Sequence, residues 1–205
     1  GTLRISAPTS FGACVMAPLI ATFLQQWPDV RVELDLTNRL VDLVDEGFDL
    51  AVRIGDIHQT DLVAKYLCAY RMVICAAPAY LSRHGTPLTP ADLAGHLCLS
   101  HTVWTARNEW KLPGVTQEVR WRRDAVLRCN DGYGLRMAAI AGAGLLLQPE
   151  VLLGEDLASG KLVRVLEAYT PEPRPVHLLW RQDLRPLPKL TRFVEHVLTE
   201  VGRHL

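Results

Sequence analysis

Serine, histidine and aspartate side chains of the kind that hydrolases use occur in three polar segments of this chain. Ser10, His101 and Asp131 have the residue types of a catalytic triad. The serine lacks the Gly-x-Ser-x-Gly turn that exposes the nucleophile in many hydrolases, and loop residues of these three types occur in most proteins. We therefore expect that the protein is not an enzyme.

Metal and cofactor chemistry is poorly supported in the same way. His96, Cys98 and His101 could offer nitrogen and sulfur ligands, but their spacing matches no standard zinc pattern, and the leucines between them predict a buried strand. The glycines of residues 142–144 fall short of a dinucleotide fingerprint, which needs three glycines between a strand and a helix. We expect neither a metal ion nor a cofactor.

Two turns that lead from a predicted strand into a predicted helix carry short polar side chains suited to ligand binding. In open α/β sheets, ligands bind outside the carboxyl ends of strands, where helix N-termini offer unpaired N–H groups. Helix capping alone also explains such residues, and the charge of Asp131 would oppose a bound anion unless it points away. The candidate ligand-binding residues in these turns are Pro8, Thr9, Ser10 and Phe11 in the first, and Asn130, Asp131 and Gly132 in the second.

Arg53 lies at the end of another predicted strand, where its planar guanidinium could clamp a carboxylate. The alternative is a salt bridge with Asp49 or Asp56.

Ser100, His101 and Thr102 also end a predicted strand, so we expect them to border the same ligand site. Trp104 and Tyr133 are candidates for an apolar wall of that site, although aromatic residues more often serve packing.

Alternating and helical hydrophobic patterns predict the elements that position these residues. In the first part of the chain, strands are expected at residues 3–7, 30–36 and 48–54, with an apolar helical stripe over 15–27 and a short helix over 40–47. This β-α-β-α-β order implies a parallel sheet with right-handed crossovers. Pro18 must either kink the first helix or mark the start of its regular part. The stripe is wide enough to suit a neighbouring subunit as well as burial within one chain.

The rest of the chain repeats this alternation of strands and helices. We expect two extended segments that cross between lobes (62–67 and 71–76), then a helix opened by Pro78 and ended near Gly85 and a capped turn at 89–93. Further strands are expected at 97–100, 125–129, 145–147, 162–166 and 176–180, with a hairpin within 104–121 and an extended connector at 171–175. Further helices are expected at 133–141, from 149 (a short one) and over 190–201 (the last one).

Composition restricts the partners and the compartment. The 205 residues have a formal net charge of +0, so the chain has no bulk positive field to attract DNA. No apolar run approaches the roughly 20 residues that cross a bilayer, and the start does not have the pattern of a signal peptide. The five cysteines form no Cys-x-x-Cys pair, which is typical of reduced cytoplasmic thiols. We expect a cytoplasmic protein without a membrane partner.

Five segments in order resemble the effector-binding (substrate-binding) domain of LysR-type transcriptional regulators. They are LRISAPTSFG, PLIATFLQQWPDVRVELDL, DLVDEGFDLAVRIG, CNDGYGLRMAAIAGAGLLLQP and PVHLLWRQDLRPLPKLTRFVEHV. The resemblance implies an α/β fold like type 2 periplasmic-binding proteins, with two Rossmann-like lobes joined by a double crossover. Lobe I would comprise residues 1–70 and 175–205, and lobe II residues 71–174. The winged helix-turn-helix that precedes this domain in the family is absent from this chain.

The resemblance also implies a function. The domain would sense a small effector, expected to be an anionic metabolite such as a carboxylate, in the inter-lobe cleft. It would control DNA binding or transcription only through the missing N-terminal domain, in a homodimer or homotetramer. The alternatives are a free-standing periplasmic solute-binding protein with the same fold, and a protein that acts by protein contact alone.

Overall fold

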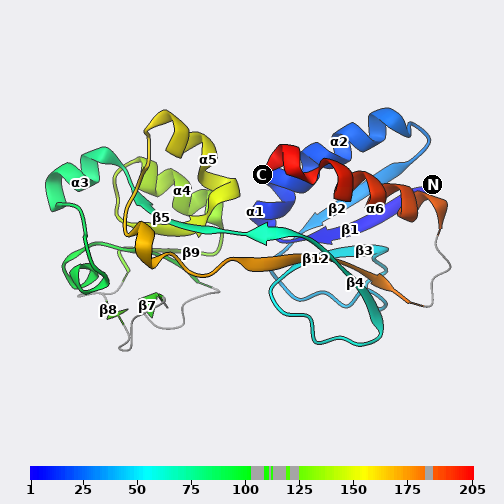
Figure 1. The fold of residues 1–205 in the computed structure, drawn as a ribbon, viewed down its shortest axis with the longest axis horizontal. Coiled ribbons are helices and arrows are strands. Elements are labelled where there is room, and N and C mark those ends of the chain that lie inside the picture. The colour runs from blue at the N-terminus through cyan, green and yellow to red at the C-terminus, as the bar shows by residue number, and fades with distance from the viewer. Residues whose placement is uncertain (103–108, 111, 113–118, 121–124, 183–186) are drawn as a thin grey trace. The chain divides into compact units, whose positions relative to one another are not determined.

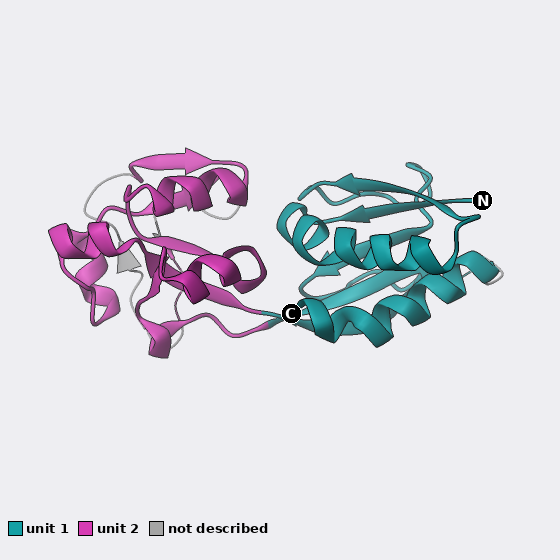
Figure 2. Ribbon diagram, turned by 90° about the horizontal axis from the view of Figure 1, so that it is seen from above, with its two compact units in different colours: residues 1–70, 174–205 teal, residues 71–173 magenta. Residues whose placement is uncertain are grey.

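The chain folds into two compact units (Figure 1). The computed structural model describes residues 1–102, 109–110, 112, 119–120, 125–182 and 187–205. Unit 1 comprises residues 1–70 and 174–205, and unit 2 comprises residues 71–173 (Figure 2). The chain therefore passes between the units twice, once in each direction.

Unit 1 is built on a five-stranded sheet in the order β2-β1-β3-β12-β4. Its strands are β1 (Thr2–Ala7), β2 (Arg31–Leu36), β3 (Leu50–Ile54), β4 (Leu62–Tyr70) and β12 (Arg174–Arg181). The first strand pairs in parallel with β2 and β3, as the sequence predicts. The returning β12 lies antiparallel between β3 and β4, so the sheet needs residues from both ends of the chain.

The first helical segment of unit 1 contains a local change of winding. It runs through α1 (Thr9–Phe11), a π-helical stretch (Gly12–Met16) and α2 (Ala17–Gln26). Pro18 lies in the first turn of α2, directly after the π-helical stretch. Of the two alternatives left open by the sequence, Pro18 therefore marks the start of the regular helix.

The apolar stripe of this segment is largely buried within unit 1. Val15, Leu19 and Phe23 have no exposed surface. Phe23 meets Phe193 of α6 (Pro188–Glu200) edge to face, with ring centroids 5.1 Å apart, and a 3₁₀ turn (Val201–His204) follows α6. The width of the stripe is thus explained by a second helix of the same chain.

The predicted helix over residues 40–47 is wrong, because this segment forms hydrogen-bonded turns. The Asp42 carboxylate accepts hydrogen bonds from the Val44 and Asp45 N–H groups at 2.9 and 3.0 Å. Gly47 then adopts a φ of +71°, which ends any helical course. Val41, Leu43 and Phe48 are buried in a small cluster beneath the turn. The spacing of these apolar residues, which suggested a helix, therefore comes from their packing together under a compact turn.

Unit 2 contains a central set of three strands and two further pairs of strands. The order β10-β5-β11 is antiparallel throughout, with β5 (Met72–Ala76), β10 (Leu146–Pro149) and β11 (Val163–Arg164). Parallel β6 (Leu99–His101) and β9 (Leu127–Cys129) join this set through a bridge between Cys98 and Leu145.

The predicted hairpin within residues 104–121 can be followed only in part. Antiparallel β7 (Glu109–Trp110) and β8 (Val119–Arg120) pair as a hairpin requires. Trp104, the candidate aromatic wall, lies outside the described residues.

Helices and turns cover the strands of unit 2. These elements are α3 (Pro78–His84), a 3₁₀ turn (Pro90–Gly95), α4 (Gly132–Ile140), α5 (Glu150–Ser159) and a short 3₁₀ turn (Glu167–Tyr169). The main core of the unit gathers Ile74, Tyr80, Leu93 and Leu145. The helix opened by Pro78 and the capped turn after Thr89 are confirmed.

Three of the five cysteines are buried, and all five are free thiols. Burial raises the pKa of the Cys68 thiol to about 11 and that of Cys75 to about 12, and it raises the pKa of Cys98 further. These thiols therefore stay protonated at neutral pH and act as small apolar side chains.

In the part of the chain that the structure describes, no helix combines the length and apolar character that a membrane span requires.

Candidate functional site

The turn after β1 is held by a residue from the end of a neighbouring strand. The Thr9 N–H donates to the Asn38 side-chain oxygen at 3.1 Å, and the Asn38 amide donates to Thr9 Oγ1 at 3.1 Å. Asn38 follows β2, the parallel neighbour of β1. Because the carboxyl ends of parallel strands meet at one edge of a sheet, this position was accessible to sequence reasoning but was missed.

The other three predicted residues of this turn differ in accessibility. Pro8 and Ser10 are half-buried, so they can reach a ligand. Phe11 has no exposed surface and packs edge to face against Tyr70, with ring centroids 6.3 Å apart. Phe11 therefore packs in the core and stabilises the turn through its contact with Tyr70.

Arg53 is half-buried in β3, and its Nη2 donates to the Val41 carbonyl at 2.5 Å. Desolvation lowers the pKa of the guanidinium, while the nearby charge of Glu46 raises it. The Asp49 carboxylate accepts from the Arg4 N–H instead, at 2.8 Å. Among the described residues, neither Asp49 nor Asp56 forms an ion pair with Arg53, and Arg53 keeps donors that a carboxylate could use.

In unit 2, two predicted segments come together because β6 and β9 run parallel. His101 lies opposite Cys129, and the Thr102 N–H donates to the Cys129 carbonyl at 3.0 Å. This pairing brings Ser100, His101 and Thr102 beside the turn of residues 130–132. The carboxyl ends of two adjacent strands thus share one polar edge.

The side chains at this edge range from buried to exposed. Ser100 and His101 are only 1% and 5% exposed, whereas Thr102 and Asn130 are exposed. Burial lowers the pKa of His101, and the neighbouring carboxylate of Asp131 partly offsets that shift. A neutral imidazole at this edge can donate or accept a hydrogen bond.

Asp131 caps α4, because its carboxylate accepts from the Tyr133 N–H at 2.8 Å. The capping interpretation therefore accounts for Asp131, and its side chain uses an N–H group that an anion would otherwise take. Gly132 is the buried first residue of the helix. Tyr133 is 57% exposed, with the Arg136 guanidinium over its ring at 5.6 Å.

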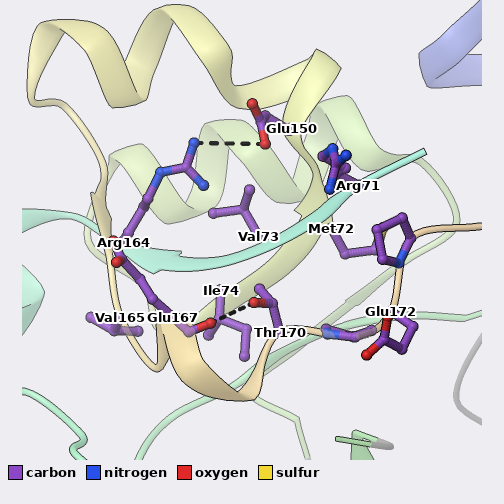
Figure 3. A pocket seen from close by; sticks show the side chains of 12 residues that line it. Arg71, Met72, Val73, Ile74, Glu150, Arg164, Val165, Glu167, Thr170 and Glu172 are labelled. Carbon is purple, nitrogen blue, oxygen red and sulfur yellow. Dashed lines mark hydrogen bonds and ion pairs between the residues drawn. The ribbon is translucent and has the colours of Figure 1, made fainter. Parts of the chain in front are cut away.

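A pocket of about 490 Å³ lies within unit 2 (Figure 3). It is lined by residues 71–74, 150, 164–165, 167 and 170–173. None of the predicted site residues contributes to it. Sequence reasoning treated these segments only as strands, the start of a short helix and a connector.

Metal coordination has no geometric support in the described residues, where no group of three or more His, Cys, Asp or Glu side chains gathers. The buried strand predicted around Cys98 is present, and His101 is the last residue of β6.

Comparison of the sequence with known protein families identifies the family of this chain. The model described as the LysR substrate binding domain matches residues 1–202. The chain belongs to this family. One relative, an uncharacterized helix-turn-helix-type transcriptional regulator of Haemophilus influenzae, is 31% identical over 180 residues, which cover 88% of this chain. The match spans 62% of that relative, and 60% of a second regulator from Xanthomonas campestris.

Solved structures agree with this assignment. The regulatory domain of CrgA from Neisseria meningitidis has a TM-score of 0.87 and 28% identity, covering 98% of this chain and 99% of that one. The full-length virulence activator AphB of Vibrio cholerae has a TM-score of 0.86 and 28% identity, covering 100% of this chain and 69% of that one. The LysR substrate-binding domain thus has the expected α/β architecture of two lobes, like type 2 periplasmic-binding proteins.

Proposed function

We propose that this chain is the effector-sensing part of a LysR-type transcriptional regulator. In this proposal, a small anionic metabolite, most simply a carboxylate, binds at the carboxyl ends of the parallel strands of both lobes. Binding then changes DNA binding or transcription through a helix-turn-helix domain outside this chain. The protein would act beside DNA in the cytoplasm as a homodimer or homotetramer.

The observation that carries the proposal is the convergence of polar groups at these strand ends. In unit 1 the Thr9–Asn38 pair holds the turn that presents Ser10. In unit 2 the parallel pairing of β6 and β9 places His101 beside the turn at Asn130. Helix N-termini follow both turns, and their positive dipole ends favour anions, although Asn38 takes the Thr9 N–H and Asp131 takes the Tyr133 N–H.

Arg53 would provide the fixed positive charge for the effector. Its guanidinium is oriented by the Val41 carbonyl and partly shielded from water, which strengthens its attraction for a carboxylate. The matched relatives are transcriptional regulators. This family membership favours a regulator over a periplasmic solute-binding protein, and gives no support to catalysis.

Regulation requires that the effector bind one arrangement of the protein better than another. A ligand shifts a conformational equilibrium only by its differential affinity for the two states. The chain passes between the units twice. An effector held by residues of both units would therefore favour one arrangement and pass this bias to the DNA-binding domains.

Calorimetric titration with a panel of aromatic and aliphatic carboxylates tests the site. We expect one carboxylate to bind, and Arg53→Ala to weaken it about tenfold or more, as loss of a charge-assisted hydrogen bond predicts. Ser10→Ala and Asn130→Ala should weaken it by smaller factors. Arg31→Ala, which removes an exposed arginine of β2, serves as the matched control with unchanged affinity.

Three results would each contradict one part of this proposal. An anionic effector whose affinity is the same for the protein and for Arg53→Ala would remove Arg53 from the site. If no carboxylate binds, the anionic effector is wrong. If an effector binds but leaves both DNA binding and transcription unchanged in the protein carrying the helix-turn-helix, the sensing function is wrong.

A further inference from the structure

The pocket in unit 2 lies where the edge of β5 is left open. Strand β11 pairs with β5 only at Cys75 and Ala76, and one more hydrogen bond joins the Val165 N–H to the Ile74 carbonyl at 2.9 Å. Beyond that bond the chain leaves β5, turns through residues 167–169 and returns as residues 170–173. Pro171 and Pro173 have no N–H to donate to a strand, so this returning segment is a poor partner for the edge.

The backbone of Met72 borders this gap. The Arg71 carbonyl accepts from the Glu150 N–H on the β10 side of the strand, at 2.9 Å. The Ile74 carbonyl accepts from Val165 on the opposite side. Because successive residues of a strand direct their polar groups to alternate sides, Met72 directs both its N–H and its C=O towards the pocket, which it lines. A donor and an acceptor are thus presented together.

Positive charge lies on the face of the sheet that α5 covers. Arg164 is opposite Cys75 in the register and forms an ion pair with Glu150, the first residue of α5, at 3.7 Å. Arg71 lies two residues before Val73 and four before Cys75, so it shares this face. Figure 3 shows Arg71 and Arg164 on the α5 side of β5. The Arg71 guanidinium has no ion-pair partner within the described residues.

Negative charge lies on the other side of the strand. Glu167 and Glu172 line the pocket below β5, on the side away from α5 (Figure 3). Their carboxylates form no ion pair within the part of the chain that the structure describes, whereas the Glu167 carbonyl accepts from the Thr170 hydroxyl at 2.6 Å. Unpaired charges of both signs therefore face one pocket from opposite sides of an open strand edge.

We propose that this pocket binds a small zwitterion of the amino-acid class, at a site separate from the proposed effector site. The ligand carboxylate is held by the Arg71 guanidinium and the Met72 N–H. Its ammonium group is held by the Met72 carbonyl and by the carboxylates of Glu167 and Glu172. The volume of about 490 Å³ lies within the range of small-molecule sites and leaves room for a side chain.

Only a ligand with both charges satisfies this arrangement. A simple carboxylate would leave the carboxylates of Glu167 and Glu172 unmatched and would be repelled by them, and a simple amine would be repelled by Arg71 and Arg164. The pocket is also lined by Arg71 and Pro173, the first and last residues of unit 2. An occupant would therefore hold both points at which the chain enters and leaves the unit, and would be coupled to any change there.

The experiment is a thermal-shift screen of the 205-residue chain with each proteinogenic L-amino acid, followed by calorimetry on the amino acid that raises the melting temperature most. Its deaminated acid and its decarboxylated amine are titrated in parallel. We expect the amino acid to bind at least tenfold more tightly than either analogue. Arg71→Gln and Glu172→Gln should each weaken binding about tenfold or more, because each removes one charged contact.

Two controls separate this site from the effector site. Arg83→Gln, at an exposed arginine of α3 in the same unit, should leave amino-acid affinity unchanged, as should Ser10→Ala in unit 1. The proposal is overturned if no L-amino acid binds, if either analogue binds as well as the amino acid, or if Arg71→Gln has no effect. Loss of amino-acid binding in Ser10→Ala would place the ligand at the effector site and would also overturn it.

Discussion

The Tyr80 hydroxyl is a polar group buried in the core of unit 2 that links two backbone segments. Tyr80 has no exposed surface, and its hydroxyl oxygen accepts from the Leu97 N–H at 3.0 Å and lies 2.7 Å from His96 Nδ1. Burial lowers the pKa of His96, so the imidazole is neutral near pH 7 and its Nδ1 can accept the hydroxyl proton. One oxygen thus joins α3 to the segment that enters β6.

Replacement of Tyr80 measures how much these hydrogen bonds contribute to the free energy of unfolding. Tyr80→Phe should lower the free energy of unfolding by about 1–3 kcal/mol, because the partly buried Leu97 N–H loses its acceptor. Urea unfolding followed by circular dichroism provides the measurement. Tyr66→Phe, at a side chain that is 57% exposed, should be close to neutral, and an equal loss in both variants would contradict the argument.

At the scale of elements, α4 and α5 are tied together by an ion pair. Arg136 Nε and Nη2 donate to the two oxygens of Asp156 at 2.6 and 3.0 Å. The Asp156 side chain is 3% exposed and that of Arg136 is 21% exposed. The hydrogen bonds and charge of Asp156 raise the pKa of Arg136. The bidentate geometry fixes one helix against the other.

Removing the arginine should be costly because it leaves a buried carboxylate without its partner. Arg136→Ala is expected to reduce the free energy of unfolding by about 2–3 kcal/mol, somewhat less than for a fully buried pair because water partly screens the arginine. Arg203→Ala breaks an exposed pair with Glu200 and should change stability little. Comparable midpoints for the two variants in chemical unfolding would argue against the role of the Arg136 pair.

At the scale of the whole molecule, the two units use the chain differently. Unit 2 is one continuous segment, residues 71–173, whereas unit 1 combines residues 1–70 with 174–205.

Unit 2 also contains His96 and His101, whose pKa values are both lowered, chiefly by burial. Acid sensitivity that comes from these two histidines should therefore begin in unit 2.

The sign of this pH dependence follows from proton uptake. Both imidazoles have folded-state pKa values below the ordinary 6.5, so below that pH the unfolded chain binds protons that the folded chain does not. Stability should be fully present above about pH 6.5 and fall as the pH drops below it. Unfolding free energies at pH 7.5 and 5.5 should differ less in His96→Gln than in the unsubstituted protein.

Substitution of the exposed His58 with Gln provides the matched control, since it should leave this pH difference unchanged. A His96→Gln variant with the same loss as the unsubstituted protein would show that burial of His96 is not its source.

Much of the fold and part of the candidate site followed from local patterns. The strand-helix-strand start, the helix after Pro78 and the last helix, predicted over 190–201 and observed at Pro188–Glu200, are confirmed. Hydrophobic periodicity, proline and glycine act on residues close to them in the sequence. The polar strand ends at His101 and Asn130 were recognisable for the same reason. Family membership also follows from the sequence, through ordered segments along almost the whole chain.

Tertiary structure decided what depends on residues far apart in the chain. Asn38 reaches Thr9 only because β1 and β2 pair in parallel, and the apolar spacing of residues 40–47 fits a turn over its own cluster better than a helix. The pocket beside Met72 is lined by residues from the segments 71–74 and 164–173, which are far apart in the chain. Local patterns specify which residues favour a strand, but pairing partners are chosen by packing and register across the whole chain.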